Sequence, residues 1–262
     1  MKKILVSVTV LLVTGFVFAQ NKSTITTIGT GNVADVEQDY TSGGVNKSII
    51  LQDHGSTIPI MNARAYITQI GGGNLSNLHQ YHQGTSSQTN GNNFEATIEQ
   101  VGQDNKSKAY QQNNNHILTV YQQGTSNYQK SNQVGNKNTG NISQYGTTNE
   151  SRLTQSGHNN NATVEQHGTS NYSKINHPDY RSTSNVYQQG TNNYSKIDEY
   201  DWYNSSSVEQ HGVGNQSFIT QNGGTGSGDP GNNNASVYQS GISYYSIITQ
   251  VGYSNTADVN QH

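Results

Sequence analysis

The most regularly spaced hydrogen-bonding side chains in this sequence are amides. Between residues 100 and 221 a glutamine, or a polar residue in its place, stands at every eleventh position, twelve times in succession. Each lies in the frame small-x-aliphatic-x-Gln-x-Gly-x-x-Asn, of which residues 162–171 (ATVEQHGTSN) are a clear copy. An amide both donates and accepts hydrogen bonds, so stacked glutamines can bond to one another. The spacing therefore indicates assembly through an amide ladder.

The repeat continues on both sides of this run. Upstream it includes Gln38, Gln52, Gln69 and Gln80, and Thr27 stands where a first glutamine would fall, so the sequence holds twenty half-units, or ten pairs. Insertions separate units near 39–46, 53–62, 81–94 and 223–232. We predict a buried ladder, required for assembly, formed by Gln100, Gln111, Gln122, Gln133, Gln144, Gln155, Gln166, Gln188, Gln210, Gln221, Gln239, Gln250 and Gln261.

Histidine and carboxylate side chains do not form a metal-site pattern. His167 and His211 are equivalent positions two coils apart, about 9.6 Å at the strand spacing, whereas zinc ligands lie about 2 Å from a shared metal. Asp229 lies in a Gly-rich stretch that resembles a calcium-binding repeat but occurs once, which favours a flexible loop. We predict neither a metal nor a cofactor.

Catalysis has little support. A nucleophile and its base must lie within hydrogen-bond distance in a recessed site. Short repeat units that stack on one another around a filled interior form no such recess. We therefore predict that the protein is not an enzyme.

A second periodic set is cationic. Five residues at 22-residue steps follow the small residue in alternate half-units, and we name them the cationic stripe: Lys108, Lys130, Arg152, Lys174 and Lys196. Like charges stacked in this way can act as gatekeepers against lateral aggregation, or as a docking surface for extracellular DNA or anionic polysaccharide. The two interpretations are compatible.

The element that positions these residues is a short strand. In 162–166 Ala162, Val164 and Gln166 alternate with outward polar residues, and Gly168 and Asn171 follow as backbone positions suited to a tight turn. Two strands and two turns close a 22-residue coil, and coils stack at about 4.8 Å. We predict an all-β fold, a β-solenoid of about ten two-strand coils.

The half-units form two rows. The odd row contains Gln100 and Gln122, and its outward positions alternate between Glu99, Glu165, Glu209 and Tyr121, Ser143, Tyr187. The even row contains Gln111 and Gln133 and departs further from the frame, with His177 and Glu199 replacing Gln, and Asp179 and Asp201 replacing Gly. We expect the odd row to be the stronger template.

Composition agrees with a repeat array. Hydrophobic residues make up 29% of the 262 residues and charged residues 11%, with a net charge of −3 and no cysteine. This excludes a large globular core, disulfides and thiolate metal sites, and it favours amide-rich β-structure over charged disorder. We divide the chain into 1–19, a signal peptide; 20–95, irregular repeats; 96–222, the regular array; 223–234, a Gly/Asn-rich insertion; and 235–262, C-terminal repeats.

The N-terminal segment predicts export. A basic start, Met1-Lys2-Lys3, precedes an apolar stretch that is too short to span a bilayer, and Ala19 is the expected cleavage position.

An export signal followed by units of the form Ser/Ala-x-Val/Ile-x-Gln-x-Gly-x-x-Asn resembles the curlin repeat family, over nearly all of 23–261. The resemblance implies a secreted bacterial amyloid subunit at the cell surface, a fibre built from copies of itself, export by a curli-type outer-membrane secretion machinery, and a nucleator or major-subunit partner in a biofilm matrix. The family's leader segment is nearly absent here, between Gln20 and Ser23.

Two functions of different classes fit the pattern. The first is a polymerising fibre subunit, and the second is a non-polymerising secreted adhesin or carbohydrate-binding solenoid. The final predicted strand, 257–261, has no capping segment after it, which favours the first because an open edge is a template. Whether the chain is a major subunit or a nucleator stays open.

Overall fold

The computed structural model describes residues 21–41, 44–54, 60–82, 93–223 and 231–262. The predicted signal peptide and the loop that contains Asp229 lie outside the described residues. Among the described residues no helix is long and apolar enough to cross a membrane.

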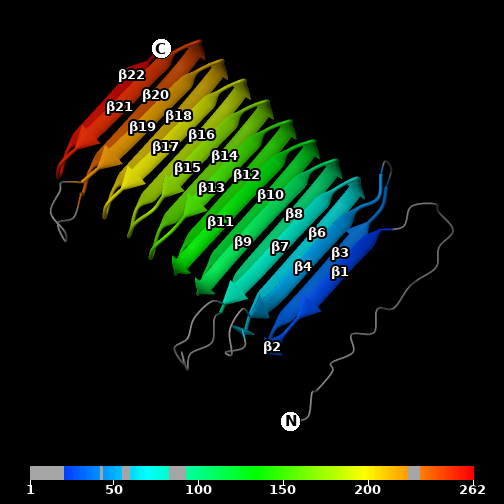
Figure 1. Ribbon diagram of the computed structural model, residues 1–262. Helices are drawn as coiled ribbons and strands as arrows, with labels where there is room; N and C mark the ends of the chain where they lie inside the picture. The colour runs from blue at the N-terminus through cyan, green and yellow to red at the C-terminus, as the bar shows by residue number, and fades with distance from the viewer. Residues whose placement is uncertain (1–20, 42–43, 55–59, 83–92, 224–230) are drawn as a thin grey trace.

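Two parallel ten-stranded sheets form the molecule (Figure 1). The chain alternates between them, so each coil contributes one strand to each sheet. We name each sheet after the row of half-units that it carries, not after its strand numbers. The even sheet carries the even row and contains β1 (Lys22–Thr27), β4 (Lys47–His54), β7 (Leu75–His82), β9 (Lys106–Asn114), β11 (Tyr128–Asn136), β13 (Glu150–Gln155), β15 (Tyr172–His177), β17 (Tyr194–Tyr200), β19 (Gln216–Asn222) and β21 (Tyr245–Val251).

The odd sheet follows the same order along the stack. Its strands are β3 (Val33–Asp39), β6 (Arg64–Gly72), β8 (Glu95–Gln103), β10 (Ile117–Thr125), β12 (Thr139–Thr147), β14 (Asn161–Thr169), β16 (Thr183–Thr191), β18 (Ser205–Val213), β20 (Asn234–Ile242) and β22 (Thr256–Gln261). A short additional pair, β2 (Gly29–Thr30) with β5 (Ile60–Met61), was not predicted. The prediction of a β-solenoid of ten two-strand coils is confirmed.

The strand register keeps equivalent residues of the repeat opposite one another. Gln122 is paired with Gln100 on one side and Gln144 on the other. The register survives the insertions as well, since Gln38 pairs with Gln69 across the longer second coil. A one-residue slip would turn every buried side chain outward, so the buried rows fix this register.

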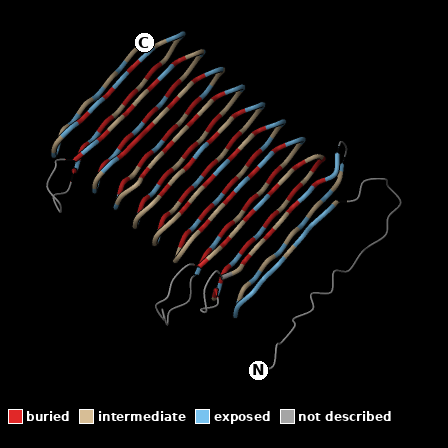
Figure 2. Tube along the Cα trace, viewed as in Figure 1, coloured by how far each residue is buried: buried red, intermediate tan, exposed pale blue. Residues whose placement is uncertain are grey.

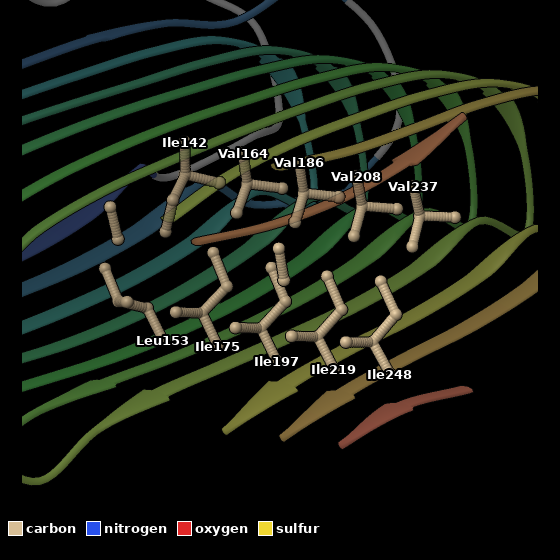
Figure 3. Packing of buried hydrophobic residues seen from close by; sticks show 12 residues of the cluster. Ile142, Leu153, Val164, Ile175, Val186, Ile197, Val208, Ile219, Val237 and Ile248 are labelled. Carbon is tan, nitrogen blue, oxygen red and sulfur yellow. The ribbon is translucent and has the colours of Figure 1, made fainter. Parts of the chain in front are cut away.

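The core is a thin layer between the two sheets. Burial alternates along each strand, as the red and pale segments of Figure 2 show. Figure 3 shows the two facing rows of aliphatic side chains, the odd row from Ile142 to Val237 and the even row from Leu153 to Ile248. These side chains are at most 5% exposed, and each buried aliphatic residue contributes about 1.5–3 kcal/mol.

The turns use different residues from those predicted. Gly168 does adopt a positive φ of 110°, and a Cβ there would lie 2.1 Å from the carbonyl oxygen of Gly190 in the next coil. The second left-handed residue, however, is Ser170, with φ 57°, and not Asn171. Asn171 is instead fully buried. The expectation that Asn171 supplies a permissive backbone position was wrong, because its side chain is needed inside the turn.

The two edges of the solenoid differ. The turns after odd-sheet strands form what we call the uniform edge, where the turns from 71–74 to 212–215 keep the frame Gly-x-x-Asn, and one insertion, near 39–46, follows β3. The turns after even-sheet strands form the variable edge, where the sequence at 113–116, 135–138, 157–160, 179–182 and 201–204 changes from coil to coil. Three of the inserted segments, 55–59, 83–92 and 224–230, also follow even-sheet strands in the sequence.

Candidate functional site: the stacked amide ladders

The odd row carries an unbroken ladder of glutamine amides. In each coil the Nε2 of one glutamine donates to the Oε1 of the glutamine in the next coil, at 2.6–2.9 Å. The members are Gln38, Gln69, Gln100, Gln122, Gln144, Gln166, Gln188, Gln210, Gln239 and Gln261. Those from Gln69 to Gln239 are fully buried.

The same amides also tie the two sheets together. The Nε2 of Gln166 donates to the backbone carbonyl of Glu150 on β13, at 3.0 Å, and Gln144 and Gln188 make the equivalent bonds to Tyr128 and Tyr172. Both amide protons are therefore used, one along the stack and one across it. A leucine could fill this volume, but it would remove both hydrogen bonds and leave a buried amide group unpaired in the coil on either side, at a cost of about 1–3 kcal/mol each.

The even row carries a similar ladder with a gap. Gln52, Gln80, Gln111, Gln133 and Gln155 are linked at 2.9–3.0 Å, and Gln221 donates to Gln250 at 2.8 Å. Between these two runs stand His177 and Glu199. At the start of the row the Oε1 of Gln52 has no hydrogen-bond partner among the described residues, and Thr27 is its neighbour in β1. The odd row is thus the continuous one.

His177 and Glu199 form a buried polar cluster inside the gap. Their side chains are 0% exposed, and Nε2 of His177 lies 3.2 Å from Oε2 of Glu199. Ser184 connects them, with its Oγ 2.7 Å from the histidine Nε2 and donating to Oε1 of Glu199 at 3.0 Å. Burial lowers the pKa of His177 to about 3 and raises the pKa of Glu199 to about 7. Both groups therefore favour their neutral forms.

A third ladder, made of asparagines, runs up the uniform edge and was missed from the sequence. The Oδ1 of each asparagine accepts the backbone N–H of the next asparagine along the stack, at 3.0–3.1 Å. Its Nδ2 donates to a glycine carbonyl, as Asn171 does to Gly190 at 3.1 Å. The members are Asn46, Asn74, Asn105, Asn127, Asn149, Asn171, Asn193 and Asn215. The signal was present, since asparagine recurs there with the same period as glutamine.

On the variable edge the corresponding column is mixed. Asn138 and Asn160 bond as on the other edge, but the neighbouring positions hold Phe94, His116 and Ser182. The Nδ1 of His116 accepts the backbone N–H of Asn138 at 3.2 Å, and burial lowers the pKa of His116 to about 4. A neutral imidazole can therefore replace the asparagine acceptor in this position.

The cationic stripe is in register on the outer face of the even sheet. Lys108 pairs with Lys130, Lys130 with Arg152, Arg152 with Lys174 and Lys174 with Lys196. Two of the five charges have partners on their own strands: Arg152 lies 2.5 Å from Glu150 and Lys196 lies 2.6 Å from Asp198. The next residue along the column is Phe218, so the stripe ends at β17.

The outer face of the odd sheet carries rings and carboxylates. Tyr121, Tyr145, His167, Tyr187 and His211 follow one another with ring centroids 4.6–5.7 Å apart. His167 and His211 each bond to a glutamate on their own strand, Glu165 at 2.6 Å and Glu209 at 2.7 Å. Tyr187 stands between the two histidines. In the described part of the chain, no three His, Cys, Asp or Glu side chains are grouped to hold a metal.

Comparison with protein families identifies the repeat. The family model of the curlin associated repeat matches residues 132–172. Residues 132–172 carry a curlin associated repeat. The matched segment holds Gln133, Gln144, Gln155 and Gln166, and it spans both edges and both sheets. Comparison with curated proteins gives no match. The predicted resemblance is confirmed, and both the curlin repeat and the β-solenoid fold are structural rather than catalytic features.

Proposed function

We propose that this protein is a secreted structural subunit that polymerises end to end into curli-type amyloid fibres. The observation that supports this most strongly is the unbroken odd-row ladder, which reaches both terminal strands of the odd sheet. Within the described residues β3 pairs on one side with β6, and β22 on one side with β20. Each of these strands leaves a row of backbone groups free to pair with another copy.

The terminal strands have matching sequences. With β22 of one copy against β3 of the next, Ala257 would face Ala34, Val259 would face Val36 and Gln261 would face Gln38. The glutamine ladder would therefore continue across the junction. In the even sheet Gln250 would face Thr27, so that ladder would stop. Such a head-to-tail contact does not close on itself and gives an open filament.

Burial at the two ends agrees with this arrangement. Ala34, Val36, Ala257 and Val259 are partly buried, whereas their counterparts inside the stack, such as Ala162, are about 1% exposed. A second copy would remove the remaining apolar surface from water and stabilise the junction.

The biological role follows from the curlin repeat. We infer an extracellular fibre at the bacterial surface that serves biofilm matrix and adhesion, with a nucleator or major subunit as partner and curli-type secretion machinery for export. The basic and apolar N-terminal segment supports export. We further propose that the cationic stripe acts as a gatekeeper during assembly and as a contact for extracellular DNA or anionic polysaccharide.

The test is assembly of the purified chain that begins at Gln20. We expect thioflavin-positive fibres with an axial reflection at about 4.7–4.8 Å, and fragmented fibres should seed fresh protein without a lag. A chain that stays monomeric and folded at all concentrations, with seeds or without, would instead support the adhesin alternative.

A further inference from the structure

Three successive turns of the variable edge bring aromatic rings together. They follow β13, β15 and β17, and they carry His158, Tyr180 and Trp202. The rings of His158 and Tyr180 stack with centroids 4.9 Å apart and planes 3° apart. Trp202 stands edge-on to Tyr180, at 5.3 Å and 75°, so the indole does not continue the parallel stack.

These rings line a surface groove of about 460 Å³. Asn159 and Arg181 complete its lining. The guanidinium of Arg181 lies over the ring of Tyr203 at 5.2 Å and bonds to its hydroxyl, so that contact orients Arg181. Tyr180 and Trp202 are each 37% exposed. The groove thus offers aromatic surface with hydrogen-bonding groups beside it.

The stacking of coils does not require these residues. Another turn of the same edge, GNKN at 135–138, closes without an aromatic residue, and the backbone bonds between coils are the same there. The same three coils also hold the gap in the even-row ladder, at His177 and Glu199. In repeat proteins the variable loops on one face commonly form the binding surface.

The charges around the groove discriminate between ligand classes. The residues that precede Tyr180 and Trp202 are Asp179 and Asp201, and Oδ2 of Asp179 accepts the backbone N–H of Asp201 at 3.0 Å. Against these two carboxylates stands one guanidinium, Arg181. A chain of phosphates would be repelled by the carboxylates. A sugar chain has hydroxyl groups that donate to carboxylates and accept from Arg and Asn, and it has apolar C–H faces that pack on aromatic rings.

We propose that this groove is a binding site for an extended neutral polysaccharide chain. Tyr180 and Trp202 supply the aromatic surface, and Arg181 and Asn159 orient the hydroxyl groups. The site lies within one copy, so it does not depend on fibre formation. On a fibre, it would recur once in every subunit along one edge.

Trp202 makes the test direct, because it is the sole tryptophan of the chain. The full chain is titrated with neutral hexasaccharides of β-1,4-linked glucose, β-1,4-linked N-acetylglucosamine and α-1,4-linked glucose, and tryptophan emission is followed. We expect a saturable change in emission with at least one of them. Tyr180→Ala and Arg181→Ala should each weaken binding by about tenfold, as the loss of one good contact predicts. Tyr172→Ala, which removes a stacked ring on the outer face of the even sheet, is the matched control and should bind normally.

Circular dichroism establishes that each variant keeps its β-structure. The proposal is overturned if none of the hexasaccharides changes the emission of Trp202, or if Tyr180→Ala and Arg181→Ala bind as the parent does. It is also overturned if a single-stranded DNA dodecamer changes the emission and the sugars do not. Trp202→Phe, measured by calorimetry, separates loss of the signal from loss of binding.

Discussion

The uniform and variable edges are built from the same repeat, yet only the uniform edge keeps the repeat's turn residues in nearly every coil. On the uniform edge an asparagine in every coil from Asn46 to Asn215 bonds to the coil on either side, and the turns from 71–74 to 212–215 keep the frame Gly-x-x-Asn. On the variable edge the column contains Phe94, His116 and Ser182, and the turns carry insertions or exposed rings. The uniform edge and the odd-row glutamines thus preserve the side-chain bonds between coils, whereas the turns of the variable edge can carry binding residues.

The largest effect should come from the odd-row ladder. Replacing Gln122, Gln144, Gln166 and Gln188 by Leu removes both bonds of each amide and leaves one buried amide group unpaired on each of Gln100 and Gln210, which costs about 1–3 kcal/mol for each unpaired group. We expect fibre elongation to fall by more than tenfold. Elongation from parental seeds, followed by thioflavin fluorescence, measures this. Tyr121→Thr with Tyr187→Thr changes the outer face of the same sheet and should alter the rate little; an unchanged rate in the leucine variant would contradict the ladder account.

A matched pair of insertions should affect the stability of the two edges differently. Arg181 on the variable edge, which precedes Ser182, and Thr148 on the uniform edge, which precedes Asn149, occupy equivalent turn positions, with φ 58° and 54°. A six-residue Gly/Ser segment after Arg181 displaces no asparagine and should lower the free energy of unfolding by less than about 1 kcal/mol, because extending a surface loop is inexpensive. The same segment after Thr148 displaces Asn149 from an uninterrupted ladder and should cost about 2–3 kcal/mol. Guanidinium unfolding measures both, and equal costs would remove the distinction between the edges.

Replacing Glu199 by Gln should change how the stability of the fold depends on pH. The pKa of Glu199 is raised by burial from 4.5 to about 7, so its contribution to stability falls as pH rises through that window. The pKa of His177 is lowered from 6.5 to about 3, so its contribution is lost as pH falls through that window. Glu199→Gln should therefore stabilise the fold at pH 8 by about 1–3 kcal/mol and have much less effect at pH 4.5. Guanidinium midpoints at both pH values test this.

The half-exposed Glu165 provides the control for that measurement, since Glu165→Gln changes a carboxylate on the outer face and should shift neither midpoint by much. A Glu199→Gln variant whose stabilisation is the same at pH 4.5 and pH 8 would show that Glu199 is not the titrating group.

The smallest effect is expected from the cationic stripe. Replacing Lys108, Lys130, Arg152, Lys174 and Lys196 by Gln should leave stability within about 1 kcal/mol, because exposed ion pairs contribute little. The lag phase should shorten if the stripe is a gatekeeper, and salt-sensitive binding of DNA or anionic polysaccharide should be lost if it is a docking surface. Unchanged lag and unchanged binding would reduce the stripe to ordinary solvated surface.

The sequence predicts the coils well because their determinants are local and repeated. A five-residue alternation followed by Gly and Asn, as in 162–171, specifies a strand and a turn, and the glutamine period specifies which strands stack. The insertions do not hide the register, since Gln69 before residues 83–92 and Gln100 after them occupy the same position of the frame and pair with each other.

What the sequence did not reveal depends on how side chains meet across coils. Asn171 fits a turn either by its own backbone or by its side chain, and the structure shows the latter. The groove around Trp202 needs residues 22 apart to lie side by side at the variable edge, which no single unit displays. Glu199 favours its neutral form because it is buried beside His177. The repeat frame shows only that a glutamate stands where a glutamine is expected.

End-to-end stacking is tested most directly by cross-linking across the junction. The chain has no cysteine, so Asp35→Cys and Asp258→Cys can be introduced separately and the two variants co-assembled. Stacking of β22 on β3 places these outward positions about 4.8 Å apart, within the Cα separation of about 4.4–6.8 Å that a disulfide spans. We predict rapid formation of mixed dimers under mild oxidation, and slow formation when Glu37→Cys, two residues out of register, replaces Asp35→Cys. Equal cross-linking of both pairs, or cross-linking of each variant mainly to itself, would contradict end-to-end stacking.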